Sequence, residues 1–408
     1  MFYNTTIVIR IVGNALARLD PNLEQAARSL GADSRRVFWR LLLPLLLPPI
    51  LAATLLVFLF DFTSFGVILL LGGPRFSTLE VEIYLQAVQL FDLPLAAWLS
   101  LIQLLCTLVF SILHSRMVRW AAVTTTPRSN TPLRPGSLRQ RTYVLLSSLV
   151  LILFFAFPLL SLPLRSFTRL EADLGQRGEI QYGLTTQYYA DLFVNRTDSV
   201  FYVPPLEALR NSLAYAAFTA VLAVALGFPA ASALARPGRL ERMLDPLLML
   251  PLGASAVTLG LGFIVSFGRL LTSPLLVPVA HTVIALPFVI RTLQPALAAI
   301  PDRLRQAAAT LGASPRRVWS EVDWPIVSRA TLSAVVFAFT ISLGEFGATV
   351  LLYRPEYPTL PTAIYRFLSQ PGGQNYGQAM AMATVLMLVA GAGILAIEKL
   401  RLPGAGEF

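Results

Sequence analysis

Few side chains in this sequence stand where they could take part in chemistry or ion movement. Two carboxylates, Asp61 and Glu345, lie inside long apolar runs, where an ionisable group is by default a candidate for a transport pathway. Lining a pathway, they would favour a cationic or cation-bound solute; the alternative is hydrogen bonding between helices. His281 and His114 also lie in apolar surroundings, and we expect them to be packing or interface residues.

The sequence contains no recognisable set of residues for catalysis, nucleotide binding or metal binding. There is no G-x-x-x-x-G-K-[ST] phosphate loop, so ATP would not bind in that way. No Ser/His/Asp set or pair of carboxylates stands near a loop. The single cysteine, Cys106, excludes an intrachain disulfide framework and a Cys-rich metal site. We therefore predict no enzyme activity, no catalytic residue, no metal and no cofactor.

The strongest pattern occurs twice. A shift of 281 positions aligns the ten residues from Leu23 with the ten from Leu304, and further matches place Phe65-Gly66 on Phe346-Gly347 and Ile83-Tyr84 on Ile364-Tyr365. Each copy reads Gln-Ala-Ala, three residues, Gly, nine residues, an aliphatic, one residue, an apolar and Pro. Its members are Gln25, Ala26, Ala27, Gly31, Leu41, Leu43 and Pro44, and then Gln306, Ala307, Ala308, Gly312, Val322, Trp324 and Pro325. The chain therefore contains two tandem halves.

Each copy predicts a helix–turn–helix. Asp20-Pro21 and Pro301-Asp302 suit the start of a helix, because proline is tolerated in the first turn and an acid stabilises it. The small alanines leave one face open to close approach by a partner. The glycine permits a sharp reversal, and the proline marks entry into the next membrane span. An ordinary helical loop is the alternative, but two copies at matching places favour a docking element.

The elements that must position these residues are membrane helices. The chain of 408 residues is 55% apolar and only 13% charged, which leaves too little polar surface for a water-soluble protein of this length. Its net charge of +10 comes from arginines in short loops, as the positive-inside rule expects, and does not indicate nucleic acid binding. We expect spans in the bilayer at about 45–71, 94–118, 143–164, 208–235, 246–268, 275–298, 328–352 and 378–399.

Arginine placement sets the orientation. The arginine-rich stretch that includes 121–142 would face the cytoplasm, and counting spans from there also places 236–242, 303–317 and the C-terminus inside. We expect a first half at 1–120 with a loop at 20–44. A cytoplasmic linker at 121–142 would join it to a second half at 143–408, which has a loop at 301–325 and a core at about 208–400.

The two halves differ in their expected content. The second half has six expected spans, whereas the first has two whole spans and a remnant at 5–19. We expect an all-α polytopic membrane protein with about eight full transmembrane helices and a first half incomplete at its N-terminus. A truncated or misassigned start would explain this, and so would a natural short form completed by another chain.

The doubled pattern resembles the EAA loop of ABC importer permeases with the type I fold, the inner-membrane components of binding-protein-dependent transport. The resemblance covers nearly the whole chain and implies a multi-pass subunit of the cell inner membrane that forms the translocation pathway. Its two loops, around Gln25–Gly31 and Gln306–Gly312, would couple to a homodimeric ATP-binding subunit that hydrolyses ATP. An extracytoplasmic solute-binding protein would deliver the solute. Both copies have Gln where the family usually has Glu, which keeps the hydrogen bonds but loses the charge.

The solute is less well determined by the resemblance. The segments 79–84 and 89–92 look like those of the fused, two-half ferric iron and thiamine permeases. Ferric iron is therefore the first expectation, with thiamine, a polyamine or a phosphonate as alternatives. A different function is also open: a secondary active transporter with internal repeats, which would need an ion site in broken helices. A membrane enzyme is a third, disfavoured by the lack of catalytic residues.

Overall fold

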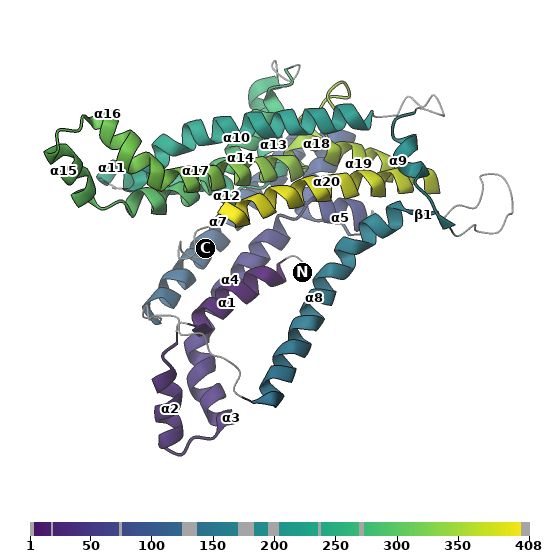
Figure 1. The fold of residues 1–408 in the computed structure, drawn as a ribbon. Helices are drawn as coiled ribbons and strands as arrows, with labels where there is room; N and C mark the ends of the chain where they lie inside the picture. Colours follow the sequence, from purple (N-terminus) through teal and green to yellow (C-terminus); the bar gives the residue numbers. More distant parts are fainter. Residues whose placement is uncertain are drawn as a thin grey trace.

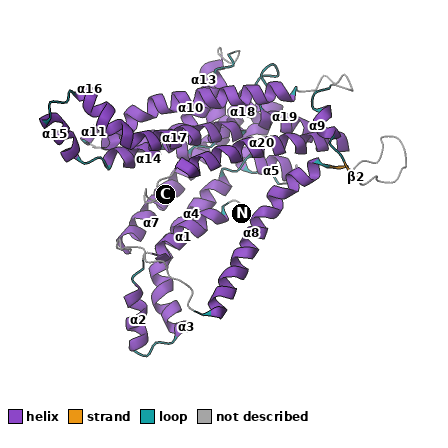
Figure 2. Ribbon diagram, viewed as in Figure 1, coloured by secondary structure: helices purple, strands orange, loops and turns teal. Residues whose placement is uncertain are grey.

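The protein is almost entirely helical wherever its structure is described (Figures 1 and 2). The computed structural model describes residues 4–17, 19–72, 76–124, 137–169, 183–194, 204–235, 238–268 and 273–400. In these ranges the only strands are β1 (Thr168–Arg169) and β2 (Gly183–Leu184), paired antiparallel with Thr168 opposite Leu184. Seven helices are long and apolar enough to cross a membrane. The prediction of an all-α polytopic membrane protein is confirmed.

The first half contains short and long helices in alternation. They are α1 (Thr5–Ala17), α2 (Pro21–Ser29), α3 (Ser34–Val37), the π-helix η1 (Phe38–Leu42), α4 (Leu43–Phe62), α5 (Gly66–Leu71), α6 (Leu79–Tyr84), the π-helix η2 (Leu85–Gln89) and α7 (Leu93–Thr124). Helix α4 packs between α1 and α7. α1 ends at Ala17 and α14 of the second half ends at the repeat-equivalent Ala298, so α1 occupies the place of the last part of α14.

The second half holds the larger bundle. Its helices are α8 (Leu138–Ser166), α9 (Gln187–Asp191), α10 (Pro205–Ala235), α11 (Arg239–Leu248), α12 (Leu250–Gly253), α13 (Ala256–Phe267), α14 (Leu276–Ala298), α15 (Asp302–Thr310), α16 (Pro315–Val318), the π-helix η4 (Trp319–Asp323), α17 (Trp324–Gly344), α18 (Gly347–Leu352), α19 (Leu360–Leu368) and α20 (Gly373–Leu400). Its core is the packing of α10, α14 and α17.

Small residues bring the core helices together. Ala223, Ala285 and Ala338 are fully buried between α10, α14 and α17. A Cβ placed on Gly227 would lie 2.7 Å from the side chain of Val289, so only glycine permits the observed approach of α10 to α14. This is how membrane helices associate in a solvent that is itself apolar, where close van der Waals packing must replace the hydrophobic effect.

Seven of the eight expected spans correspond to the seven long helices. The expected span 246–268 differs, because the structure divides it into the end of α11, α12 and α13. Pro251 lies in the first turn of α12, and the Ser255 side chain accepts a hydrogen bond from the Thr258 N–H to start α13. Helix α13 has 12 residues and so spans about 18 Å, too short for a hydrocarbon core of about 30 Å.

Two other expected spans are broken near one end. The helix expected at 45–71 is interrupted between α4 and α5 at residues 63–65, and that expected at 328–352 is interrupted between α17 and α18 at Glu345-Phe346. The breaks fall at matching places in the repeat. The centre of the expected linker, 125–136, lies outside the described residues, with α7 ending before it and α8 starting after it.

The two halves meet at one end and diverge at the other (Figure 1). At the shared end, α6 and α7 of the first half contact α12 and α13 of the second. At the other end, Figure 1 shows α2–α3 and α15–α16 at the tips of two separate arms. Helices α4 and α17 run the length of these arms, so each joins a tip to the place where the halves meet.

Candidate functional site

The two arm tips have the same backbone design. In the first, which we call elbow 1 (residues 20–44), the N–H of Ala32 donates to the Ala27 carbonyl at 3.0 Å and Gly31 has φ +83°. In elbow 2 (residues 301–325), the N–H of Ala313 donates to the Ala308 carbonyl at 3.1 Å and Gly312 has φ +83°. This pattern is a Schellman motif, in which a left-handed glycine ends the helix and satisfies its last carbonyls. Both predicted helix–turn–helix elements are present.

Side chains complete both elbows in similar ways. The Asp20 carboxylate accepts a hydrogen bond from the Asn22 N–H at 3.0 Å and starts α2. After the turn, Asp33 caps α3 by accepting from Arg36, and Ser314 caps α16 by accepting from Arg317. These short side chains satisfy the free N–H groups of a new helix. Each second helix then continues through a five-residue π-helix into α4 or α17, where Pro44 and Pro325 occupy the first turn.

The elbow tips expose an apolar side chain. Leu30 and Leu311 are repeat equivalents, and each is 88% exposed immediately before the glycine. Gln25, Ala26, Gln306 and Ala307 are exposed as well, while Ala27 and Ala308 are half-buried. A single exposed leucine needs no explanation. Both tips, however, expose the same leucine beside exposed small residues, so the two elbows present equivalent surfaces.

At the opposite end of the arms, four aromatic rings close the contact between the halves. Phe65 stacks on Phe346 with ring centroids 5.5 Å apart. Tyr84 packs against Phe65 at 5.4 Å and Tyr365 against Phe346 at 5.5 Å, and the two tyrosine hydroxyls are close neighbours. A Cβ on Gly66 would lie 3.2 Å from the Phe346 ring, so this glycine leaves room for it. We call these four residues the aromatic quartet.

The quartet has the symmetry of the repeat. Phe65 and Phe346 are equivalent positions, as are Tyr84 and Tyr365. Residues that match across the repeat therefore touch each other across the interface. The sequence shows that these positions match in the repeat. It does not predict a role for them, because a repeat does not say whether equivalent residues meet or lie far apart.

A buried carboxyl lies beside the quartet. Glu80 on α6 is fully buried and accepts a hydrogen bond of 2.5 Å from the Gln103 amide of α7. The Thr258 hydroxyl of α13 donates to the other end of this amide at 3.3 Å, which links the two halves. Burial raises the pKa of Glu80 to about 7, and the negative Glu345 adds to the shift while Ser255 and Gln103 oppose it. Sequence reasoning missed Glu80, because its repeat equivalent is Pro361 and the site has no second copy.

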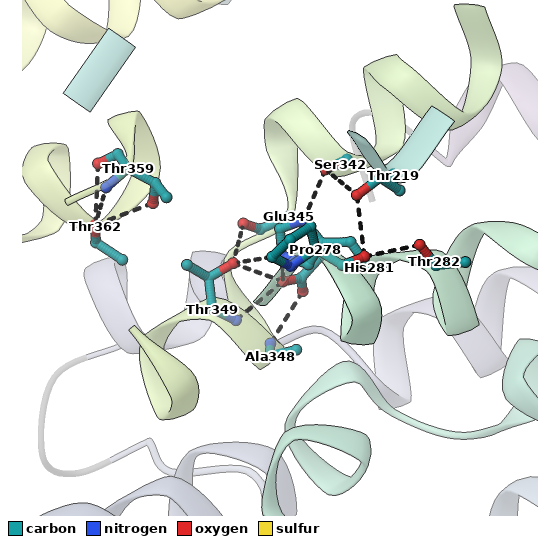
Figure 3. A network of polar contacts seen from close by, with 10 residues as sticks. All are labelled: Thr219, Pro278, His281, Thr282, Ser342, Glu345, Ala348, Thr349, Thr359 and Thr362. Atoms are coloured by element: carbon teal, nitrogen blue, oxygen red, sulfur yellow. Dashed lines mark hydrogen bonds and ion pairs between the residues drawn. The ribbon is translucent and has the colours of Figure 1, made fainter. Parts of the chain in front are cut away.

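The predicted pathway residue Glu345 lies in a polar network at the break between α17 and α18 (Figure 3). Its carboxylate accepts hydrogen bonds from the Ala348 and Thr349 N–H groups, both at 3.1 Å, and so caps α18. The His281 ring of α14 lies 3.3 Å from the same carboxylate and is hydrogen-bonded to Thr349 and Ser342 at 2.8 and 2.7 Å. His281 is therefore not a simple packing residue.

This network is confined to the second half. The Ser342 hydroxyl donates to Thr219 of α10 at 3.2 Å, so four helices share one set of buried hydrogen bonds. Asp61, the other predicted pathway residue, accepts a hydrogen bond of 2.7 Å from Asn4 in the first half. The structure does not bring the two carboxylates together. In this conformation both make the contacts of the alternative interpretation, hydrogen bonding between helices. His114 also joins two helices, through a 3.0 Å contact with the Ala52 carbonyl.

Comparisons with known proteins agree with this architecture. Residues 1–123 match the family model "Binding-protein-dependent transport system inner membrane component". The thiamine transport system permease protein of Brucella suis biovar 1 is 28% identical over 393 residues, which covers 95% of this chain and 67% of that protein. A putative 2-aminoethylphosphonate transport system permease protein of Salmonella paratyphi A is 28% identical over 62% of this chain and 92% of that protein.

A molybdenum permease is more similar in sequence over a shorter length. The molybdenum transport system permease protein of Mycobacterium tuberculosis is 35% identical over 209 residues, covering 47% of this chain and 77% of that protein. This similarity, the two elbows and the seven long apolar helices describe a multi-pass transport subunit of the inner membrane rather than an enzyme. The chain belongs to the family of binding-protein-dependent transport system inner membrane components, the permeases of ABC importers.

Proposed function

We propose that this chain moves a thiamine-like organic cation across the inner membrane, driven by a separate ATPase that binds elbow 1 and elbow 2. The observation that carries the proposal is the pair of equivalent elbows, each with a left-handed glycine and an exposed leucine, at the tips of two diverging arms. Two docking surfaces of the same design fit two copies of one ATP-binding subunit, and hence a homodimer.

The arms supply the mechanical connection. Residues Ser34–Phe62 and Pro315–Gly344 form continuous helices of 29 and 30 residues, which run about 45 Å from an elbow to the aromatic quartet. When the ATPase closes and draws the elbows together, the arms would pivot and separate Phe65 from Phe346. In the structure, the quartet is closed at one end of the arms and the elbows are separated at the other end. The separated elbows described here fit an inward-facing state. ATP binding would shift the protein away from this state.

The solute is best supported as an organic cation. Aromatic faces attract cations, above all quaternary ones, and four aromatic rings meet where the two halves contact each other. Thiamine carries a permanently cationic thiazolium ring. The relative whose name gives thiamine matches 95% of this chain, across both halves. We therefore place thiamine ahead of ferric iron, a polyamine, molybdate or a phosphonate.

The remaining partners and the orientation follow from the elbows. If the elbows face the cytoplasm, α7 and α20 return to the same side, so the linker at 125–136 and the C-terminus would be cytoplasmic. The aromatic quartet would then lie toward the outer face, where an extracytoplasmic solute-binding protein delivers the solute. The bilayer surrounds the seven long helices.

Coexpression with an ABC-type ATP-binding subunit tests the docking role. We expect the two chains to co-purify, and the double variant Gly31→Val, Gly312→Val to lose the ATPase, because valine does not adopt φ +83°. The matched control is Gly13→Val, Gly391→Val, where nothing lies within 4 Å of the added Cβ and φ is not positive. ATPase association that survives the first double change would contradict the docking role.

Reconstitution separates this function from secondary transport. In proteoliposomes with the ATPase and a binding protein, thiamine uptake should require ATP and should not respond to an ion gradient alone. Uptake driven by a proton or sodium gradient without the ATPase would favour the secondary transporter instead.

A further inference from the structure

The two elbows share a backbone but differ in how charged side chains connect them to their arms. In elbow 2, the Arg305 guanidinium of α15 donates to the Asp323 carboxylate at 2.8 Å, and it also lies 3.6 Å from Asp302. Asp323 is the last residue of η4, directly before α17. The pair therefore connects the docking helix to the start of the arm.

This connection is partly shielded from water. The Arg305 side chain is 25% exposed and that of Asp323 only 10%. Separating the partners of such a pair is unfavourable, because each charge would then be desolvated and unpaired. The pair therefore restrains the two helices that carry it. By contrast, pairs within one exposed helix contribute little and restrict nothing beyond that helix.

Elbow 1 lacks the connection. The position equivalent to Arg305 is Glu24, and the position equivalent to Asp323 is Leu42. Glu24 pairs instead with Arg28 on the same exposed face of α2, at 2.6 Å. Elbow 2 also has an Arg317–Glu321 pair at 2.9 Å, where the equivalent residues of elbow 1 are Arg36 and Arg40, two like charges. Both of these are exposed pairs within one helix, so the shielded Arg305–Asp323 pair is the contact of elbow 2 for which elbow 1 has no counterpart.

We propose that Arg305 and Asp323 are positioning residues that brace elbow 2 to its arm, so that the two elbows transmit the motion of the ATPase unequally. Elbow 2 moves with α17 as one rigid lever, whereas elbow 1 flexes between α2 and α4. The inference rests on the docking role proposed above, and it adds that a symmetric ATPase acts on this chain through one stiff contact and one compliant contact.

Spin labels test the brace in the permease alone, without any ATPase. In a Cys106→Ser background, one label pair would be at Thr310→Cys and Ser328→Cys across elbow 2. The equivalent pair would be at Ser29→Cys and Leu47→Cys across elbow 1. We expect a narrower distance distribution across elbow 2, broadened to that of elbow 1 by Arg305→Gln. Equal widths in the unmodified elbows, or no broadening, would overturn the brace.

A charge swap tests its consequence in the assembled importer. Arg305→Asp and Asp323→Arg should each leave co-purification with the ATPase intact but lower the solute carried per ATP hydrolysed by about threefold or more. The double variant Arg305→Asp, Asp323→Arg should recover the ratio, and Glu24→Gln serves as the matched control in elbow 1. Complexes that assemble with an unchanged ratio in both single variants would overturn the inference. An unmodified chain that binds no ATPase would instead contradict the docking role.

Discussion

Phe65 and Phe346 stack on each other with their ring centroids 5.5 Å apart, although 281 positions separate them in the chain and each holds the same place in its own half. The two halves therefore contact each other through equivalent residues. Under the lever motion proposed above, drawing the two elbows together would separate these two rings. The proposed lever therefore makes this stacked pair the place to test for closure.

Truncation of the pair should allow solute to leak. We expect Phe65→Ala, Phe346→Ala to weaken the closed contact by about 3 kcal/mol or more, because both rings leave a buried cluster. The measurement is ATP-independent efflux of a small dye or of thiamine from proteoliposomes. Phe58→Ala is the control, since Phe58 stacks only with aromatic residues of its own half. Vesicles with the double variant that stay as tight as the unmodified protein would contradict the role of the quartet as a closure.

Glu80 should make the contact between the halves depend on pH. Its pKa in the folded protein, about 7, is above the ordinary value of 4.5, so between these values the folded state holds a proton that an exposed carboxyl would lose. Stability is therefore fully present below about pH 4.5, falls by about 3 kcal/mol as the pH rises to about 7, and is level above that.

Thermal unfolding in detergent between pH 5 and 8 measures the effect. We expect the unmodified protein to lose stability over this range and Glu80→Gln to flatten the curve. Glu82→Gln changes a half-buried carboxyl on the same helix, which is hydrogen-bonded to Gln86, and should leave the curve unchanged. A slope that persists in Glu80→Gln would assign the pH dependence to another group.

One experiment distinguishes the two interpretations of Glu345, as a residue of the transport pathway or as a hydrogen-bonding residue between helices. Glu345→Ala removes the cap of α18 and leaves the His281 ring and two N–H groups without their acceptor, at an expected cost of about 2–4 kcal/mol. We expect thermal stability to fall while transport per folded molecule changes little. Asp61→Ala, in the first half, should also lower thermal stability, because it removes the hydrogen bond with the Asn4 side chain. Transport that is lost at unchanged stability would instead place Glu345 in the pathway.

The exposed leucines should matter only for the partner. Leu30→Asp, Leu311→Asp should leave thermal stability within about 0.5 kcal/mol, because both side chains are already in water, and should abolish ATPase binding. Leu184→Asp is a matched control, since Leu184 is also 88% exposed but lies on β2, away from both elbows. Pull-down of the ATPase and a melting curve measure the two properties separately. Unaltered binding would show that the leucines are not part of the docking surface.

Much of this architecture is a local property of the sequence. Eight apolar runs predicted eight spans and seven of them are long helices, because a helix in lipid must be apolar along its length, which composition alone reveals. The elbows were predictable because glycine at Gly31 and Gly312 reports a backbone conformation directly. The repeat, at a shift of 281 positions, predicted that both elbows have the same helix–turn–helix structure. The segment 246–268 shows the limit, since apolar content did not reveal that Pro251 and the Ser255 cap divide it into short helices.

What the sequence could not determine is which helix faces touch. Nothing in the sequence distinguishes Phe65, Glu80 or Asp323 from other residues of apolar or mixed segments. Their partners lie far away in the sequence or on another helix. In a membrane both lipid and protein neighbours favour apolar side chains, so hydropathy does not distinguish an outer face from an interface. The elbows and spans were therefore determined by the sequence itself. The aromatic closure, the Glu345–His281 network and the Arg305–Asp323 pair were decided only when tertiary packing set the positions of the helices.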